Sequence, residues 1–121
     1  MNNQQAVVIF EALSSEVRLE IFKLLLKYGE KGLVAGDIAE ALEIPNTNLS
    51  FHLKALYHAG VVEMTKEGRF VRYHIKTPEV FSLINFLLGS CCQESVGCCE
   101  IDPANFPALK QLFSKSSKDT E

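Results

Sequence analysis

The sequence predicts a mainly α-helical domain that carries one small β-hairpin. Its 121 residues suit a single domain, and a hydrophobic content of 47% is enough to build a core. Apolar residues recur at helical spacing in five segments, and after Gly60 the pattern changes to the two-residue alternation of strands. These observations exclude a two-domain enzyme and a wholly disordered chain.

The amino-terminal part predicts two helices. Helical spacing indicates a helix over residues 4–13, and Ser14 or Ser15 can cap a second helix. Gly29 is suited to end that second helix. The positions expected to face the core are Ala6, Ile9, Phe10 and Leu13 in the first helix, and Val17, Ile21, Leu24, Leu25 and Tyr28 in the second.

Two further helices are predicted on either side of Pro45. The first covers residues 35–42 and turns Ile38, Ala41 and Leu42 inward. Pro45 interrupts the chain, after which Asn46 or Thr47 can cap a helix that ends near Gly60.

The helix after Pro45 has two contrasting faces. At about 100° per residue, Leu49, Leu53 and Leu56 share one face and are expected in the core. The opposite face and its flanks are polar except for one aromatic, whose exposure costs free energy unless something covers it. The residues expected there are Thr47, Asn48, Ser50, Phe51, Lys54 and His58.

The segment after Gly60 predicts a hairpin and a last helix. Residues 61–64 and 69–75 read as strands, joined by a turn over residues 65–68 in which Gly68 supplies a positive φ and Arg69 lies at the tip. In the second strand Val71, Tyr73 and Ile75 should point one way, and Arg72 and His74 the other. The last helix should begin at Thr77-Pro78-Glu79 and carry an apolar stripe of Val80, Leu83, Ile84, Leu87 and Leu88.

This order of elements predicts a winged helix-turn-helix that binds double-stranded DNA. In that motif the second helix enters the major groove, and the hairpin reaches the backbone or the minor groove. The net charge of the chain is −3, but residues 46–76 hold five basic and two acidic residues, a local balance of +3. The alternatives are a solvated surface helix and a winged helix that binds proteins. The predicted DNA contacts are Asn46, Thr47, Asn48, Ser50, Phe51, Lys54, Arg69 and Arg72.

The first and last helices predict a dimer. A minimal winged helix needs neither, and pairing their apolar stripes with a second copy gives a C2 homodimer. Its two recognition helices would lie about 34 Å apart, which suits an inverted-repeat operator. The alternative is that both helices pack on their own subunit. We expect residues 1–90 to form the DNA-binding and dimerisation domain, and residues 91–121 a cysteine-containing segment with a flexible tail.

The cellular compartment and the type of chemistry are predicted from targeting segments, the cysteines and enzyme motifs. No basic residue precedes the first apolar residues, and no apolar run is long enough to span a bilayer, so we expect a cytoplasmic protein with no membrane partner. The cysteines are confined to Cys91, Cys92, Cys98 and Cys99, a cluster typical of a metal or redox site rather than a disulfide framework. The sequence has no Cys-x-x-Cys and no Gly-rich phosphate loop, so an enzyme is not expected.

Several segments resemble the ArsR/SmtB family of metal-sensing repressors. The similarity lies in residues 13–21, 37–39, 49–56 and 59–62, and in Gly68, Arg69 and Tyr73 of the hairpin. The resemblance implies a homodimeric repressor that leaves its operator when an inducer binds. It also adds His52, at the edge of the DNA-binding face, to the predicted contacts.

The resemblance directs attention to the cysteines as the inducer site. Members that sense on the third helix have a Cys-x-Cys there, whereas this chain has Val34-Ala35-Gly36. Members that bind zinc between their last helices need histidine, and residues 79–88 contain none. The cluster after the last helix is similar to that of arsenite-responsive members.

The resemblance implies trivalent arsenic or antimony as the inducer, and the chemistry of the donor set supports it. Thiolates are soft ligands, and these ions take three sulfurs in a pyramid, whereas the spacing fits tetrahedral zinc and iron–sulfur clusters poorly. The expected ligands are Cys91, Cys92 and Cys98, with Cys99 as a substitute. Another thiophilic metal, an organoarsenical, thiol oxidation, and surface thiols without a function remain as alternatives.

Overall fold

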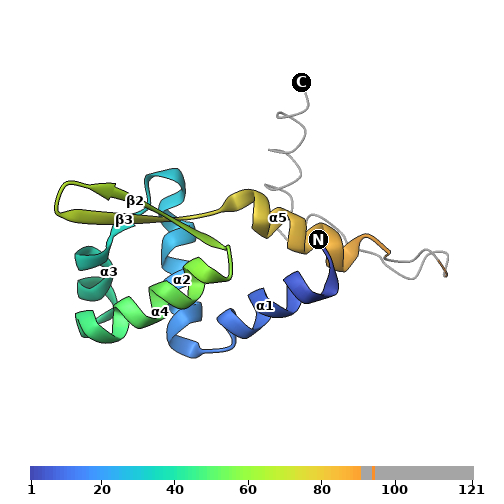
Figure 1. Ribbon diagram of the computed structural model, residues 1–121, viewed down its shortest axis with the longest axis horizontal. Helices are drawn as coiled ribbons and strands as arrows, with labels where there is room; N and C mark the ends of the chain where they lie inside the picture. The colour runs from blue at the N-terminus through green and yellow to red at the C-terminus, as the bar shows by residue number, and fades with distance from the viewer. Residues whose placement is uncertain (91–93, 95–121) are drawn as a thin grey trace, which may run out of the picture. The chain divides into compact units, whose positions relative to one another are not determined.

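The computed structural model describes residues 1–90 and Glu94. Five α-helices, a short 3-10 helix and a three-stranded antiparallel sheet follow one another in this part of the chain (Figure 1). They are α1 (Asn3–Leu13), α2 (Glu16–Tyr28), η1 (Gly29–Lys31), β1 (Leu33–Val34), α3 (Ala35–Leu42), α4 (Asn46–His58), β2 (Val62–Glu67), β3 (Phe70–Ile75) and α5 (Thr77–Leu88). The predicted mainly α-helical winged helix-turn-helix is confirmed.

One hydrophobic core joins all five helices to the sheet. The buried residues are Ala6, Ile9 and Ala12 of α1, Ile21, Phe22 and Leu25 of α2, Ile38 of α3, Leu49, Leu53 and Leu56 of α4, and Val61, Val62, Ile75 and Leu83. The leucine row of α4 therefore faces the core, as the spacing predicted. Met1–Leu88 forms one compact unit that contains this core.

Four inward assignments of the sequence analysis are wrong, the first being Phe10 of α1, which is 45% exposed. Val17 and Tyr28 are exposed because they lie at the two ends of α2, where the apolar stripe runs past its packing partners. Phe22 is buried in their place. Ala41 is also exposed, since α3 buries only Ile38 completely.

Of the two helix N-caps predicted from the sequence, the one of α2 is confirmed and the one of α4 is wrong. Ser15 caps α2, with its side chain accepting from the backbone N–H of Arg18. Neither Asn46 nor Thr47 caps α4, because Pro45 is the N-cap residue, with a φ of −58° and a ψ of 142°. The helix therefore begins one residue earlier, and both polar side chains lie in its first turn, exposed.

A strand absent from the sequence-based prediction completes the sheet. β1 pairs with β3, with Leu33 opposite Tyr73, so that β3 is the central strand. Gly32, which precedes β1, has a φ of 62° and packs so closely on Tyr73 that a Cβ would meet the carbonyl oxygen of that residue. The sequence gives no periodic signal here because two residues are too few to alternate.

The hairpin is longer than predicted. β2 extends to Glu67, which pairs with Phe70, so the turn contains only Gly68 and Arg69. Gly68 has the expected positive φ of 62°. Residues 65–67 belong to the ladder rather than to the turn, because each finds a cross-strand partner on β3.

A tight turn joins α3 to α4. Glu43 adopts the left-handed conformation with a φ of 54°, and the backbone N–H of Ile44 donates to the carbonyl of Ala39 at 3.0 Å. This is the hydrogen-bond pattern of a Schellman motif, a position at which glycine is usual. The turn places the start of α4 away from the core.

Apolar side chains stay exposed on the first and last helices. On α1, Val7, Val8 and Phe10 are about half exposed, and on α5 so are Leu87 and Leu88. Their own subunit therefore covers only part of the predicted stripes. No helix in the described part of the chain is long and apolar enough to cross a membrane.

Candidate nucleic-acid interface

The outer face of α4 is held outward by the leucines on its inner face. Leu53 is 1% exposed and its neighbours in the row are buried equally deeply. Phe51, by contrast, is 71% exposed, and Lys54 is exposed beside it. An aromatic side chain left in water next to a cation provides a surface that a partner can cover. Phe51 and Lys54 therefore lie on the solvent-exposed face that the helical spacing predicted.

The amino-terminal end of α4 is suited to a phosphate. Its first turn contains no carboxylate and its N-cap makes no side-chain hydrogen bond, so backbone N–H groups and the positive end of the helix dipole stay available. Asn46, Thr47 and Asn48 are exposed on this turn and add hydrogen-bonding side chains. Contacts of this kind fix the register of a protein on the DNA backbone.

The tip of the hairpin lies toward the same end of the view as the amino-terminal end of α4 (Figure 1). Lys66 and Arg69 are exposed at the tip, and Phe70 is 63% exposed next to them. Two cations and an aromatic on a protruding hairpin match the chemistry of a DNA-contacting wing.

Arg72 and His74 are engaged within the hairpin. Nε of Arg72 donates to Oε2 of Glu67 at 2.9 Å, and Nη1 donates to the carbonyl of Lys31 at 3.2 Å. His74 Nε2 lies 2.9 Å from Oε2 of Glu63 on the facing strand. These contacts stiffen the ladder and join it to η1. Of the two predicted arginines, Arg69 is therefore the one whose guanidinium is exposed at the tip.

A groove of about 280 Å³ is lined by residues of α4 and of the strands β2 and β3. Leu53 lies at its base, and Lys54 and His58 supply cationic or hydrogen-bonding groups along α4. Burial raises the pKa of the Tyr73 phenol above its ordinary value, so the hydroxyl remains a neutral donor. The groove is lined by Ser50, Leu53, Lys54, Tyr57, His58, Met64 and Tyr73.

His52 lies at the edge of the outer face, as expected. It is half-buried, and its Nδ1 lies 3.4 Å from Nη1 of Arg18 on α2. Its ring meets the ring of Phe51 edge-to-face, with centroids 6.0 Å apart. His52 therefore connects the exposed aromatic to the interior of the helical bundle.

Two residues of this surface escaped the sequence analysis. Phe70 alternates with Arg72 and His74 along β3, so the strand pattern already placed it on their face. Arg18 gave no such signal, because its partner His52 is 34 positions away in the sequence.

The predicted inducer ligands Cys91, Cys92, Cys98 and Cys99 lie outside the described residues. Within residues 1–90 and at Glu94, no three His, Cys, Asp or Glu side chains are grouped so that they could hold a metal ion.

Comparison with known sequences supports a DNA-binding surface. Residues 13–65 match a family model described as a helix-turn-helix domain. The chain is 35% identical to the transcriptional activator HlyU of Vibrio cholerae, over 76% of this chain and 82% of HlyU. It is 36% identical to the transcriptional repressor SdpR of Bacillus subtilis, over 74% of this chain and 90% of SdpR. It is 32% identical to the arsenical resistance operon repressor of B. subtilis, over 69% and 75% of the two chains.

Solved structures show the same architecture. An ArsR-like transcriptional regulator from Rhodococcus sp. RHA1 is 28% identical with a TM-score of 0.66, over 90% of this chain and 92% of that one. A homodimeric winged helix-turn-helix DNA-binding domain from Mycobacterium bovis is 26% identical with a TM-score of 0.56, over 75% and 84%. The reduced form of V. cholerae HlyU is 34% identical with a TM-score of 0.59, over 76% and 94%.

Proposed function

Because this chain belongs to the ArsR/SmtB family of transcriptional regulators, we propose that it is a homodimeric repressor whose release from DNA is triggered by trivalent arsenic or antimony. Helix-turn-helix regulators bind DNA, and the family assignment extends that activity to this chain. The operator is an inverted repeat, the inducer ligands are Cys91, Cys92 and Cys98, and Cys99 can substitute for one of them. The single observation that supports DNA binding best is the exposed outer face of α4 over a buried leucine row.

DNA recognition divides among the exposed groups. The first turn of α4 and the wing cations Lys66 and Arg69 contact phosphates and set the register. Ser50 and Lys54 reach base edges in the major groove, and Phe51 covers a thymine methyl. His52 contributes from the edge of the same face.

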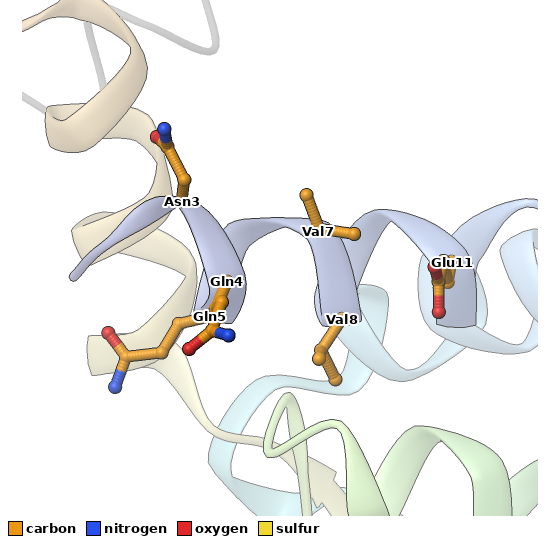
Figure 2. A pocket seen from close by; sticks show the side chains of 6 residues that line it. All are labelled: Asn3, Gln4, Gln5, Val7, Val8 and Glu11. Atoms are coloured by element: carbon orange, nitrogen blue, oxygen red, sulfur yellow. The ribbon is translucent and has the colours of Figure 1, made fainter.

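The exposed apolar residues of α1 and α5 support the homodimer. Figure 2 shows the exposed flank of α1, where Val7 and Val8 lie among the polar side chains of Asn3, Gln4, Gln5 and Glu11. The exposure of valines on α1 and of leucines on α5 to water is unfavourable in free energy, and a second copy that covers both helices removes this exposure. One of the solved relatives is described as homodimeric, which agrees with this assignment. A C2 pair places two α4 helices about one helical turn of DNA apart, and an inverted-repeat operator follows from that symmetry.

Four thiols within nine residues support the choice of inducer. Thiolates prefer soft, thiophilic ions, and an arsenical resistance operon repressor is among the relatives of this chain. The cluster follows α5 directly in the sequence, so an ion held there acts on a helix that contributes Leu83 to the core. Operator affinity falls only as far as the inducer binds the DNA-incompatible state more tightly, typically by about 1–3 kcal/mol.

The test uses the full-length protein and a labelled duplex selected from a randomised pool. Fluorescence anisotropy in the presence of a phosphine reductant should show binding at low salt and release on addition of arsenite. Cys91→Ser combined with Cys92→Ser should bind the duplex normally and resist release. Cys99→Ser is the matched control, since it removes one thiol from the same cluster and should still respond. Normal release of the double variant would contradict the assigned ligands.

Thiol oxidation is the second candidate for the signal. One solved relative is described as reduced HlyU, and the four thiols of this chain are themselves oxidisable. An oxidative signal requires an oxidant such as a peroxide or diamide, which takes two electrons from two thiolates as they form a disulfide. Release by diamide, reversed by the phosphine and absent with arsenite, would replace the arsenic proposal with this one.

A further inference from the structure

The side chain of Arg18 joins three helices. Arg18 lies in the first turn of α2, and its Nε donates to the carbonyl oxygen of Ala12 at 2.6 Å. Ala12 is in the last turn of α1, which contains no basic residue of its own. The last carbonyls of a helix lack intrahelical partners, and a cation there is favoured by the helix dipole. The other end of the same guanidinium reaches Nδ1 of His52 on α4 at 3.4 Å.

This contact indicates which ring nitrogen of His52 accepts a hydrogen bond. A guanidinium carries only donors, so Nδ1 of His52 must accept the hydrogen bond. With Nδ1 accepting, the ring N–H of this tautomer is on Nε2. No buried side-chain nitrogen in the described part of the chain lacks a hydrogen-bond partner. Since no described residue accepts a hydrogen bond from Nε2, this atom keeps some exposure to solvent.

The position of His52 gives that N–H a role. His52 stands between Phe51, which is exposed on the outer face, and Leu53, which is buried in the core. The neighbouring Phe51 ring packs edge-to-face on the imidazole. A donor at the edge of a helix that enters the major groove can reach a phosphate oxygen or the N7 of a purine.

We propose that Arg18 is a positioning residue for operator binding: it holds His52 in the tautomer that presents Nε2–H to an acceptor on the DNA, and it ties α4 to the end of α1. This proposal rests on the DNA binding proposed for α4, and it gives Arg18 a role that acts through His52 rather than through a contact of its own with the operator. It also gives α1, a helix proposed at the dimer interface, a direct connection to the recognition surface.

The first test measures the tautomer in the wild-type protein. Long-range proton–nitrogen NMR correlations on the full-length chain should show His52 protonated at Nε2 and unprotonated at Nδ1 at neutral pH. Arg18→Gln should mix the two tautomers, whereas Lys27→Gln, which removes a positive charge from the same helix without reaching α4, should not. A His52 ring protonated at Nδ1 in the wild-type protein would overturn the proposal.

The second test is a double-mutant cycle in operator binding. Arg18→Gln should weaken binding about tenfold at constant salt, and Lys27→Gln should change it by less than about twofold. The amide of His52→Gln keeps a donor near the position of Nε2 without an Nδ1 acceptor, so Arg18→Gln should add little loss in that background. An equal loss in both backgrounds would overturn the proposal.

Two controls keep the result distinct from other failures. Thermal melts establish that each variant is folded, and Arg18→Lys supplies a second variant whose ammonium can satisfy Ala12 but lacks the planar fork that reaches both partners. That variant should melt like the wild type and still bind about as weakly as Arg18→Gln. If the wild-type protein bound no duplex, the proposed function would fail first. Normal wild-type binding with an unaffected Arg18→Gln would remove only the inference about Arg18.

Discussion

Replacing Phe51 by alanine should weaken operator binding and leave the stability of the fold unchanged. Phe51 is 71% exposed, and a phenylalanine that becomes fully covered loses about 150–250 Å². DNA can therefore cover roughly 110–180 Å² of it, worth at most roughly 3–4.5 kcal/mol at about 25 cal/mol per Å². If the duplex covers half of that area, the loss is about 1.5–2 kcal/mol, or about tenfold to thirtyfold in Kd.

Leu53→Ala is the matched variant from the opposite face of the same helix. Leu53 is 1% exposed, and truncation of a buried leucine costs about 2–5 kcal/mol of stability through lost burial and a residual cavity. We expect urea titrations to show this loss for Leu53→Ala and a change below about 0.5 kcal/mol for Phe51→Ala. Anisotropy titrations should show the loss of affinity for Phe51→Ala. A Phe51→Ala protein that is destabilised but binds DNA normally would refute the assignment of the two faces of α4.

Three further predictions concern the backbone and the sheet. Glu43→Gly should stabilise the protein by about 0.5–1 kcal/mol, because glycine adopts the left-handed conformation of this turn without a Cβ penalty; a lower Tm would contradict this. Gly32→Ala should destabilise more than Gly29→Ala, since both have positive φ but only a Cβ at Gly32 meets backbone, that of Tyr73; equal urea midpoints would show that the close approach is unimportant. Burial raises the pKa of Tyr73, so its contribution to stability is complete below about pH 10 and is lost as the pH rises further. Tyr73→Phe should flatten this alkaline loss in pH-dependent unfolding, and an unchanged slope would count against it.

The sequence predicted the helices, the hairpin and the outer face of α4 because these depend on local spacing. Leu49, Leu53 and Leu56 repeat at a helical period, and that period fixes which side of α4 is buried whatever the helix packs against. The opposite side, with Phe51 and Lys54, followed from the same spacing. The cysteine cluster is likewise identified from the sequence alone, and the proposed inducer chemistry depends on it.

Only the tertiary structure decided the features that join distant segments. β1 is only two residues long and is a strand because it pairs with the edge of β3. No sequence pattern within Leu33–Val34 could therefore predict it. Pro45, rather than Asn46 or Thr47, is the N-cap residue of α4, because the helix begins at the residue directly after Pro45. The contact between Arg18 and His52 depends on how α2 packs against α4, across 34 positions of sequence. Local periodicity constrains each element by itself, whereas these pairings arise only when the elements are packed together.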